Sequence, residues 1–150
     1  MSGKRQMIPI AGLLMTVAIA GYMVVRIDGQ ESAVTGDFTT ATMAEVRDAQ
    51  GVIVLRGQFV MVDEEDDDVE RQATLEPTGA DQDATGEAEV EFSREAPAVQ
   101  EVEFSVENLE PGAALTFLID GNDVATATVD RRGRAEVELD VRIPGTSASR

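Results

Sequence analysis

The side chains of this chain that could bind a ligand are almost all carboxylates. Asp81-Gln-Asp83-Ala-Thr85-Gly86 matches the first half of an EF-hand loop, in which spaced oxygen ligands surround Ca²⁺. Position twelve of that loop would be Phe92, which cannot supply the usual bidentate carboxylate, and a strand pattern follows instead of a helix. The sequence therefore favours a polar turn here, with a weak calcium site at Asp81, Asp83 and Thr85 as the alternative.

A denser acidic run extends from Asp63 to Glu70, where seven of eight residues are Asp or Glu. Such a run could gather Ca²⁺, but it lacks the glycine and the regular spacing of a preformed calcium loop. Because like charges this close repel one another and favour solvent, we interpret the run as an exposed loop.

Alternating glutamates are a third group of candidates. They occupy every second position of three otherwise apolar segments: Glu89, Glu91, Glu101, Glu103, Glu136 and Glu138. They could form an acidic docking face, or they could keep a sheet soluble and its edges unpaired. Paired carboxylates also hydrolyse glycosides, but nothing in the sequence suggests a sugar-binding cleft. The basic residues Arg131, Arg132 and Arg134 fall on a turn. We interpret them as offsetting nearby acidic charges, and a basic contact patch is the weaker alternative.

Composition excludes most other chemistry. The 150 residues include no histidine and no cysteine, which removes the usual general base, thiol catalysis, cysteine and histidine zinc ligands, and disulfides. The formal net charge of −17 opposes binding to nucleic acid or to anionic lipid, since both need a basic protein surface. We therefore expect a protein that is not an enzyme.

The alternation that places the glutamates also predicts the fold. Its apolar positions are Val90, Phe92, Val102, Phe104, Val106, Val137, Leu139 and Val141. A period of two indicates strands with one buried and one solvated face. Gly57 is expected at a bend or bulge, and Asp120-Gly121 in a tight hairpin. Seven to eight strands within residues 51–143 predict an all-β antiparallel β-sandwich, with a small closed barrel as the alternative.

Residues 7–25 are expected to contact the membrane. These nineteen uncharged residues follow Lys4 and Arg5, and as a helix they would span about 28 Å, close to the hydrocarbon thickness of a bilayer. Basic residues on the short side keep the N-terminus in the cytoplasm and place the rest in the periplasm or at the cell surface. The alternative is a signal peptide cleaved after Ala20, which would release a secreted protein.

The sequence therefore divides into a membrane anchor or signal segment at 1–28, a flexible stalk at 29–50, the β-sandwich domain at 51–143 and a disordered tail at 144–150. The stalk is inferred from small polar residues and weak periodicity. Within it, Ala41 to Ala49 could form a short helix.

Two segments carry a resemblance to known modules. Leu109-Glu110-Pro111-Gly112-Ala-Ala-Leu115 resembles the Leu-x-Pro-Gly-x-x-Tyr corner of fibronectin type III and related immunoglobulin-like modules, with Leu115 in place of the tyrosine. More loosely, Asn108 to Val141 resembles the C-terminal part of uncharacterised exported bacterial β-sandwich proteins. The resemblance implies a β-sandwich fold and brings no catalytic residues.

Two classes of function follow from these patterns. One is a non-enzymatic, exported, membrane-anchored module that binds a protein partner or supports the cell envelope. The other is a carboxylate-based calcium-binding protein or an accessory domain of an enzyme. The first predicts acids spread over an exposed face, whereas the second needs acids that converge in one pocket.

Overall fold

The computed structural model describes residues 13–19, 22–28, 36–65, 67–79, 81–95 and 99–143, which contain eleven strands and no helix. The strands are β1 (Leu13–Ile19), β2 (Tyr22–Asp28), β3 (Met43–Arg47), β4 (Ile53–Gln58), β5 (Val60–Glu65), β6 (Asp68–Pro77), β7 (Thr85–Ser93), β8 (Val99–Glu107), β9 (Ala114–Ile119), β10 (Asn122–Thr128) and β11 (Ala135–Arg142). The prediction of an all-β fold is confirmed.

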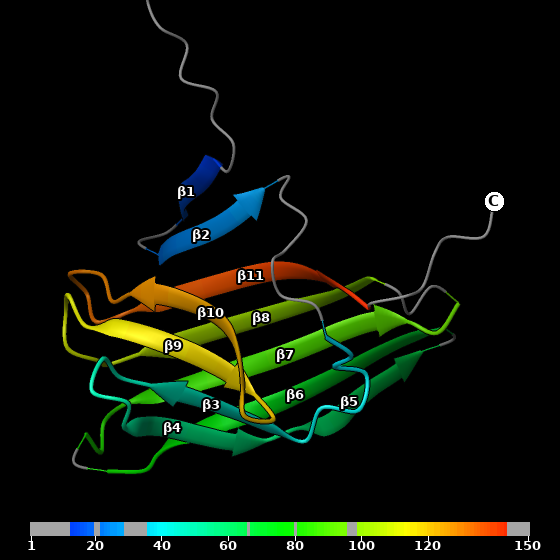
Figure 1. The fold of residues 1–150 in the computed structure, drawn as a ribbon, viewed down its shortest axis with the longest axis horizontal. Helices are drawn as coiled ribbons and strands as arrows, with labels where there is room; N and C mark the ends of the chain where they lie inside the picture. The colour runs from blue at the N-terminus through cyan, green and yellow to red at the C-terminus, as the bar shows by residue number, and fades with distance from the viewer. Residues whose placement is uncertain are drawn as a thin grey trace, which may run out of the picture.

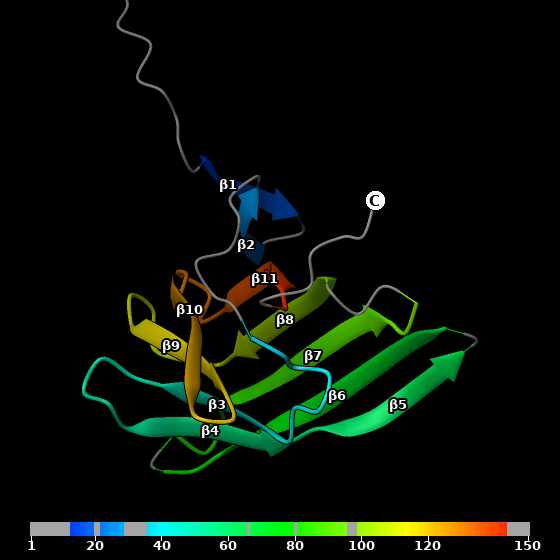
Figure 2. The ribbon, with the colours of Figure 1, turned by 45° about the vertical axis from the view of Figure 1, so that its right-hand side comes forward.

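Strands β3 to β11 form one antiparallel, barrel-like sheet. Its order is β11-β8-β7-β6-β4-β3-β9-β10, and β5 pairs with β6 beside this path. In Figure 1, β5, β6, β7, β8 and β11 make one layer, and β4, β3, β9 and β10 cross in front of it. Figure 2 shows the same two layers turned, with β10 returning towards β11.

The sheet folds over at β6. The N-terminal half of β6 pairs with β5, and its last two residues pair with β4, which then turns away to pair with β3. At this crossing the backbone of Gly57 lies against β6, where an added Cβ atom would come 2.1 Å from the Thr74 carbonyl oxygen. Only glycine permits such an approach, so Gly57 lets β4 cross close to β6. β4 runs through Gly57 to Gln58, and the bend or bulge expected at this glycine stays a prediction.

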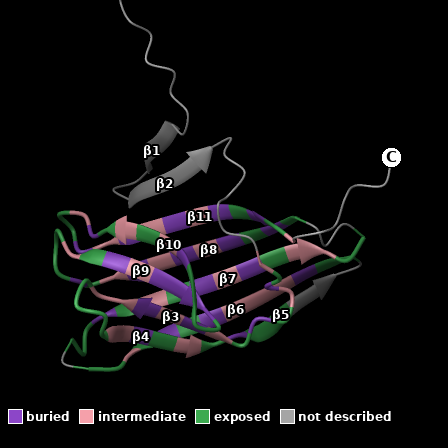
Figure 3. Cartoon of the chain, viewed as in Figure 1, coloured by how far each residue is buried: buried purple, intermediate pink, exposed green. Residues whose placement is uncertain are grey.

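The hydrophobic core lies between the two layers (Figure 3). The inward positions predicted from alternation are buried, except that Phe92 is half-buried at the end of β7. Phe104 of β8 and Phe117 of β9 meet across the core with ring centroids 4.9 Å apart and planes tilted by 47°. This contact joins strands that are distant in the sheet order, so the core holds the folded sheet closed.

The segment before β3, residues 36–42, is fastened to both layers. The fully buried Gln100 side chain accepts a hydrogen bond from Phe38 N at 2.6 Å and donates one to Gly36 O at 3.1 Å. The Asp120 carboxylate in the β9–β10 turn accepts bonds from Thr42 N and Met43 N at 3.1 and 2.8 Å. Because a buried amide must have its hydrogen bonds satisfied, Gln100 specifies where this segment lies.

The expected flexible stalk at 29–50 is wrong for residues 36–50. Ala44 and Val46 of β3 are fully buried, and β3 pairs with β4 on one side and β9 on the other. The short helix considered for 41–49 is therefore also wrong. The folded unit includes residue 36 rather than beginning at Gly51, whereas residues 29–35 and the tail at 144–150 lie outside the described ranges.

The loop expected for the acidic run is a hairpin instead. β5 continues to Glu65, β6 starts at Asp68, and these two residues pair with each other. Val69 is buried and pairs with Phe92 of β7, so packing and the neighbouring strand hold the run in the sheet despite its charge.

The helix predicted for residues 7–25 is not present in the described part of that segment. β1 pairs with β2 in antiparallel register, and β2 lies parallel to β11 over Glu136, Val137 and Glu138. Residues 7–12 and 20–21 lie outside the described ranges. Across the described ranges, no helix is long and apolar enough to cross a membrane.

Candidate binding surface

The outer face of β6, β7, β8 and β11 carries most of the candidate residues. Alternation turns one side chain in two away from the core, and the strand register aligns these positions into three rows across the sheet. The rows are Glu70–Glu91–Glu101–Asp140, Gln72–Glu89–Glu103–Glu138 and Thr74–Glu87–Ser105–Glu136. Nine of these twelve positions are acidic and none is basic, and we call their carboxylates the acid face.

Like charges are placed directly opposite each other on the acid face. Glu89 of β7 pairs with Glu103 of β8, and Glu91 pairs with Glu101 in the next row. Directly opposed like charges on neighbouring strands destabilise a sheet, by up to about 1 kcal/mol for a pair. The core therefore stabilises the sheet against a repulsion that the acid face imposes.

Burial and repulsion raise the pKa of three carboxyls on this face. Partial burial raises the pKa of Glu89 to about 7, and the charges of Glu70 and Glu103 add to that effect. The pKa of Glu103 is also raised, first by burial and then by Glu136 and Glu138. Burial raises the pKa of Glu136, and the charge of Glu138 adds to that effect. A cationic group that approached would relieve this repulsion.

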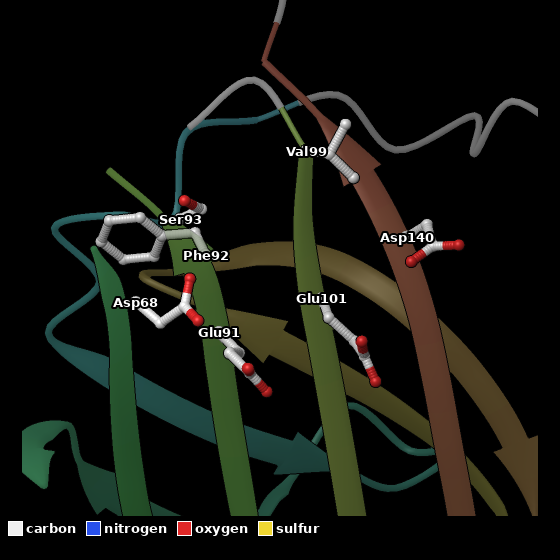
Figure 4. A pocket seen from close by; sticks show the side chains of 7 residues that line it. All are labelled: Asp68, Glu91, Phe92, Ser93, Val99, Glu101 and Asp140. Atoms are coloured by element: carbon white, nitrogen blue, oxygen red, sulfur yellow. The ribbon is translucent and has the colours of Figure 1, made fainter. Parts of the chain in front are cut away.

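Two hollows lie on the acid face, each of about 180 Å³. One is lined by Glu87, Glu89, Glu103 and Ser105. The other, shown in Figure 4, is lined by Asp68, Glu91, Phe92, Ser93, Val99, Glu101 and Asp140. In this second hollow, the carboxylates of Glu91, Glu101 and Asp140 come from three neighbouring strands and share the face with the exposed side chain of Val99, whereas the half-buried ring of Phe92 points away from them and packs against the core. The arrangement suits a positively charged group with an apolar stem.

The predicted calcium ligands lie outside the three acid face rows, although Thr85 stands one row beyond Glu87 on the same strand. Asp81 and Asp83 are exposed in the turn before β7, and Thr85 is the exposed first residue of that strand. Across the described ranges, no group of three or more Asp, Glu, His or Cys side chains is arranged to hold a metal ion. The calcium site at these three residues stays a prediction.

The arginine cluster at 131, 132 and 134 surrounds a tight turn. The Asp130 carboxylate accepts hydrogen bonds from Arg132 N at 2.7 Å and from Arg134 N at 3.0 Å. The hydrogen bond from the Arg134 backbone has the largest effect and lowers the pKa of Asp130, and the bond from Arg132 lowers it further. Asp130 therefore shapes the turn through the arginine backbone.

Sequence reasoning placed six glutamates on this face but missed Glu70, Glu87 and Asp140. Glu87 and Asp140 continue the alternation of strands already recognised and could have been found from that pattern. Glu70 could be placed on this face only once the structure showed that β6 extends into the acidic run.

Comparison of the chain with family models, curated proteins and solved structures finds no match.

The raised carboxyl pKa values make stability depend on pH. Between about pH 4.5 and 7, folded Glu89 binds a proton that the unfolded chain releases, so the free energy of unfolding decreases as pH rises through this window. We expect thermal melts of the full chain to show a higher Tm at pH 5 than at pH 8. Glu89→Gln should raise Tm at pH 8 and flatten the dependence. A Tm that rises from pH 5 to pH 8 would contradict this electrostatic account.

Proposed function

We propose that this protein is a non-enzymatic, exported interaction module whose acid face binds a cationic surface of a partner protein. The single observation that carries the proposal is the set of three carboxylate rows, in which register brings like charges together on one exposed face. A domain that needed charge only for solubility could scatter its acids over all faces. Aligning nine of the 29 acids in rows without a basic residue creates a negative field that attracts and orients a basic partner.

The absence of histidine and cysteine from the sequence supports a binding role over catalysis. An enzyme with only carboxylates needs two of them across a cleft that holds the substrate. The acid face instead spreads its carboxylates over four strands. We propose further that the two layers form a β-sandwich similar to those of exported immunoglobulin-like modules.

Octalysine tests the acid face directly as a cationic probe. We expect the full chain to bind octalysine at low ionic strength, with affinity falling by at least about tenfold when NaCl is raised from about 50 to 500 mM. Calcium should compete no better than magnesium at equal ionic strength. Absence of binding at low salt would contradict the proposal, and selective competition by Ca²⁺ would favour the calcium-binding alternative.

We propose that residues 7–25 anchor the module to the membrane, with the domain outside the cytoplasm. An apolar segment can satisfy the hydrogen bonds of its backbone by pairing with another strand or, inside a bilayer, by forming a helix. The nineteen uncharged residues beside Lys4 and Arg5 suit the helical state in a membrane.

Membrane fractionation and N-terminal sequencing test this anchor. We expect the protein to remain in the membrane fraction after alkaline carbonate extraction, with an intact N-terminus, because an uncharged span of this length partitions into the bilayer. A soluble exported protein that begins at Gly21 would show cleavage after Ala20 and would exclude the anchor.

A further inference from the structure

Strand β5 forms an exposed margin of the folded sheet. It pairs with β6 on one side, and no strand lies on its other side within the described ranges. Figure 2 shows β5 at the outer margin of its layer. A free strand edge presents backbone donors and acceptors that another extended chain can pair with.

The first half of β5 is apolar as well as exposed. Val60, Met61 and Val62 are 58%, 47% and 48% exposed, and only Val52 and Val99 join them as exposed large hydrophobic residues in the described ranges. Natural edge strands usually carry charges or proline that block pairing with other chains. The consecutive exposed apolar residues leave this part of the edge without such a block.

The register connects this edge with the acid face. Val60 stands opposite Gln72, at the end of the row that continues through Glu89 and Glu103. Asp63 stands opposite Glu70, at the end of the neighbouring row. A strand added to β5 would therefore extend the sheet on the side of β6, and alternate residues of that strand would lie on the same side of the sheet as the acid face and in its negative field.

We propose that the free edge of β5 binds an extended segment of a partner protein in which apolar and basic residues alternate. Charge complementarity selects this occupant over a second copy of the chain, because two β5 strands would bring two acidic runs together. The added strand gains backbone hydrogen bonds from the edge, apolar contact from Val60 to Val62, and attraction from the acid face. The inference rests on the proposed function and specifies how the cationic partner is held.

A decapeptide of alternating valine and lysine is the probe. We expect it to bind the full chain, and we expect N-methylation of two adjacent central amides to weaken binding by at least about tenfold, because both edges of the peptide then lose donors. Equal binding of the two peptides would overturn strand addition while leaving the acid face as a cation-binding surface. If neither peptide binds, strand addition is overturned, and octalysine binding then tests the acid face separately.

Two matched variants locate the peptide. Val62 sits at the register shift of β5, and Val52 immediately precedes β4; they are 48% and 57% exposed, so a lysine at either site adds the same charge at an exposed position. We expect Val62→Lys to weaken decapeptide binding at least about tenfold and Val52→Lys less than about threefold. Equal effects would overturn the β5 site, as would sedimentation of the unmodified chain as a dimer that Val62→Lys dissociates.

Discussion

Phe104→Ala is expected to lower the free energy of unfolding by about 3–5 kcal/mol. Phe104 is fully buried at the middle of β8, where its ring meets Phe117 across the core. Truncation would remove this ring contact and leave a cavity between layers that are joined by no disulfide. Since small domains have about 5–15 kcal/mol of total stability, the variant should be largely unfolded at a temperature where the parent is folded.

Phe92→Ala provides the matched control, because Phe92 is half-buried at the end of the neighbouring strand β7. Urea unfolding of the three proteins should give a much smaller loss for Phe92→Ala than for Phe104→Ala. Equal losses, or a loss below about 1 kcal/mol at Phe104, would contradict the register that places Phe104 in the core.

Gly57→Ala is expected to be nearly as damaging, although it adds only one methyl group. That methyl carbon would lie 2.1 Å from the Thr74 carbonyl oxygen and 3.2 Å from a methyl group of Leu75. Backbone cannot yield as a flexible side chain does, so β4 would have to move away from β6 at the fold of the sheet. We expect a loss at the upper end of the usual cost of overpacking, about 3 kcal/mol.

Gly79→Ala is the control for this substitution. No atom lies within 4 Å of the position that its Cβ would occupy, and we expect a change within about 0.5 kcal/mol. Thermal melts of both variants measure the comparison. A Gly57→Ala protein as stable as Gly79→Ala would show that the close crossing of β4 and β6 is not what folds the sheet over.

Local pattern was enough to predict the strands that carry the longest alternation. In β7, β8 and β11 the alternating apolar residues face the core, apart from exposed Val99 at the start of β8, and each acid faces outward, because one face packs and the other meets solvent. The hairpin at Asp120-Gly121 could also be predicted from the sequence, because Asp and Gly tolerate positive φ; the two residues have φ of 49° and 81°.

Pairing with strands distant in the sequence determines the structure of segments whose local pattern does not predict a strand. β3 is only five residues long and carries Glu45 and Arg47 beside small apolar residues, so its local preference for a strand is weak. It becomes a central strand because β4 and β9 pair with it on both sides. Likewise, the acidic run joins the sheet because β7 and buried Val69 hold β6 in place.

The acid face shows the same division between local and tertiary information. Alternation alone indicated that glutamates share an outward face, but it could not show which glutamates lie opposite one another. That pairing depends on hairpin register, which places Glu89 opposite Glu103. Burial raises the pKa of Glu89, and the nearby charges of Glu70 and Glu103 add to that effect. Register also brings Glu70 of the acidic run into line with Glu91.

The affinity for octalysine of two triple variants with equal charge is the most direct test of the acid face. One variant, Glu91→Gln with Glu101→Gln and Glu138→Gln, removes three charges from the acid face. The other, Asp81→Asn with Asp83→Asn and Glu110→Gln, removes three charges from exposed turns elsewhere. We expect the first to weaken binding at least about tenfold and the second less than about threefold. Equal weakening would show that only net charge matters and would contradict a binding role for the acid face.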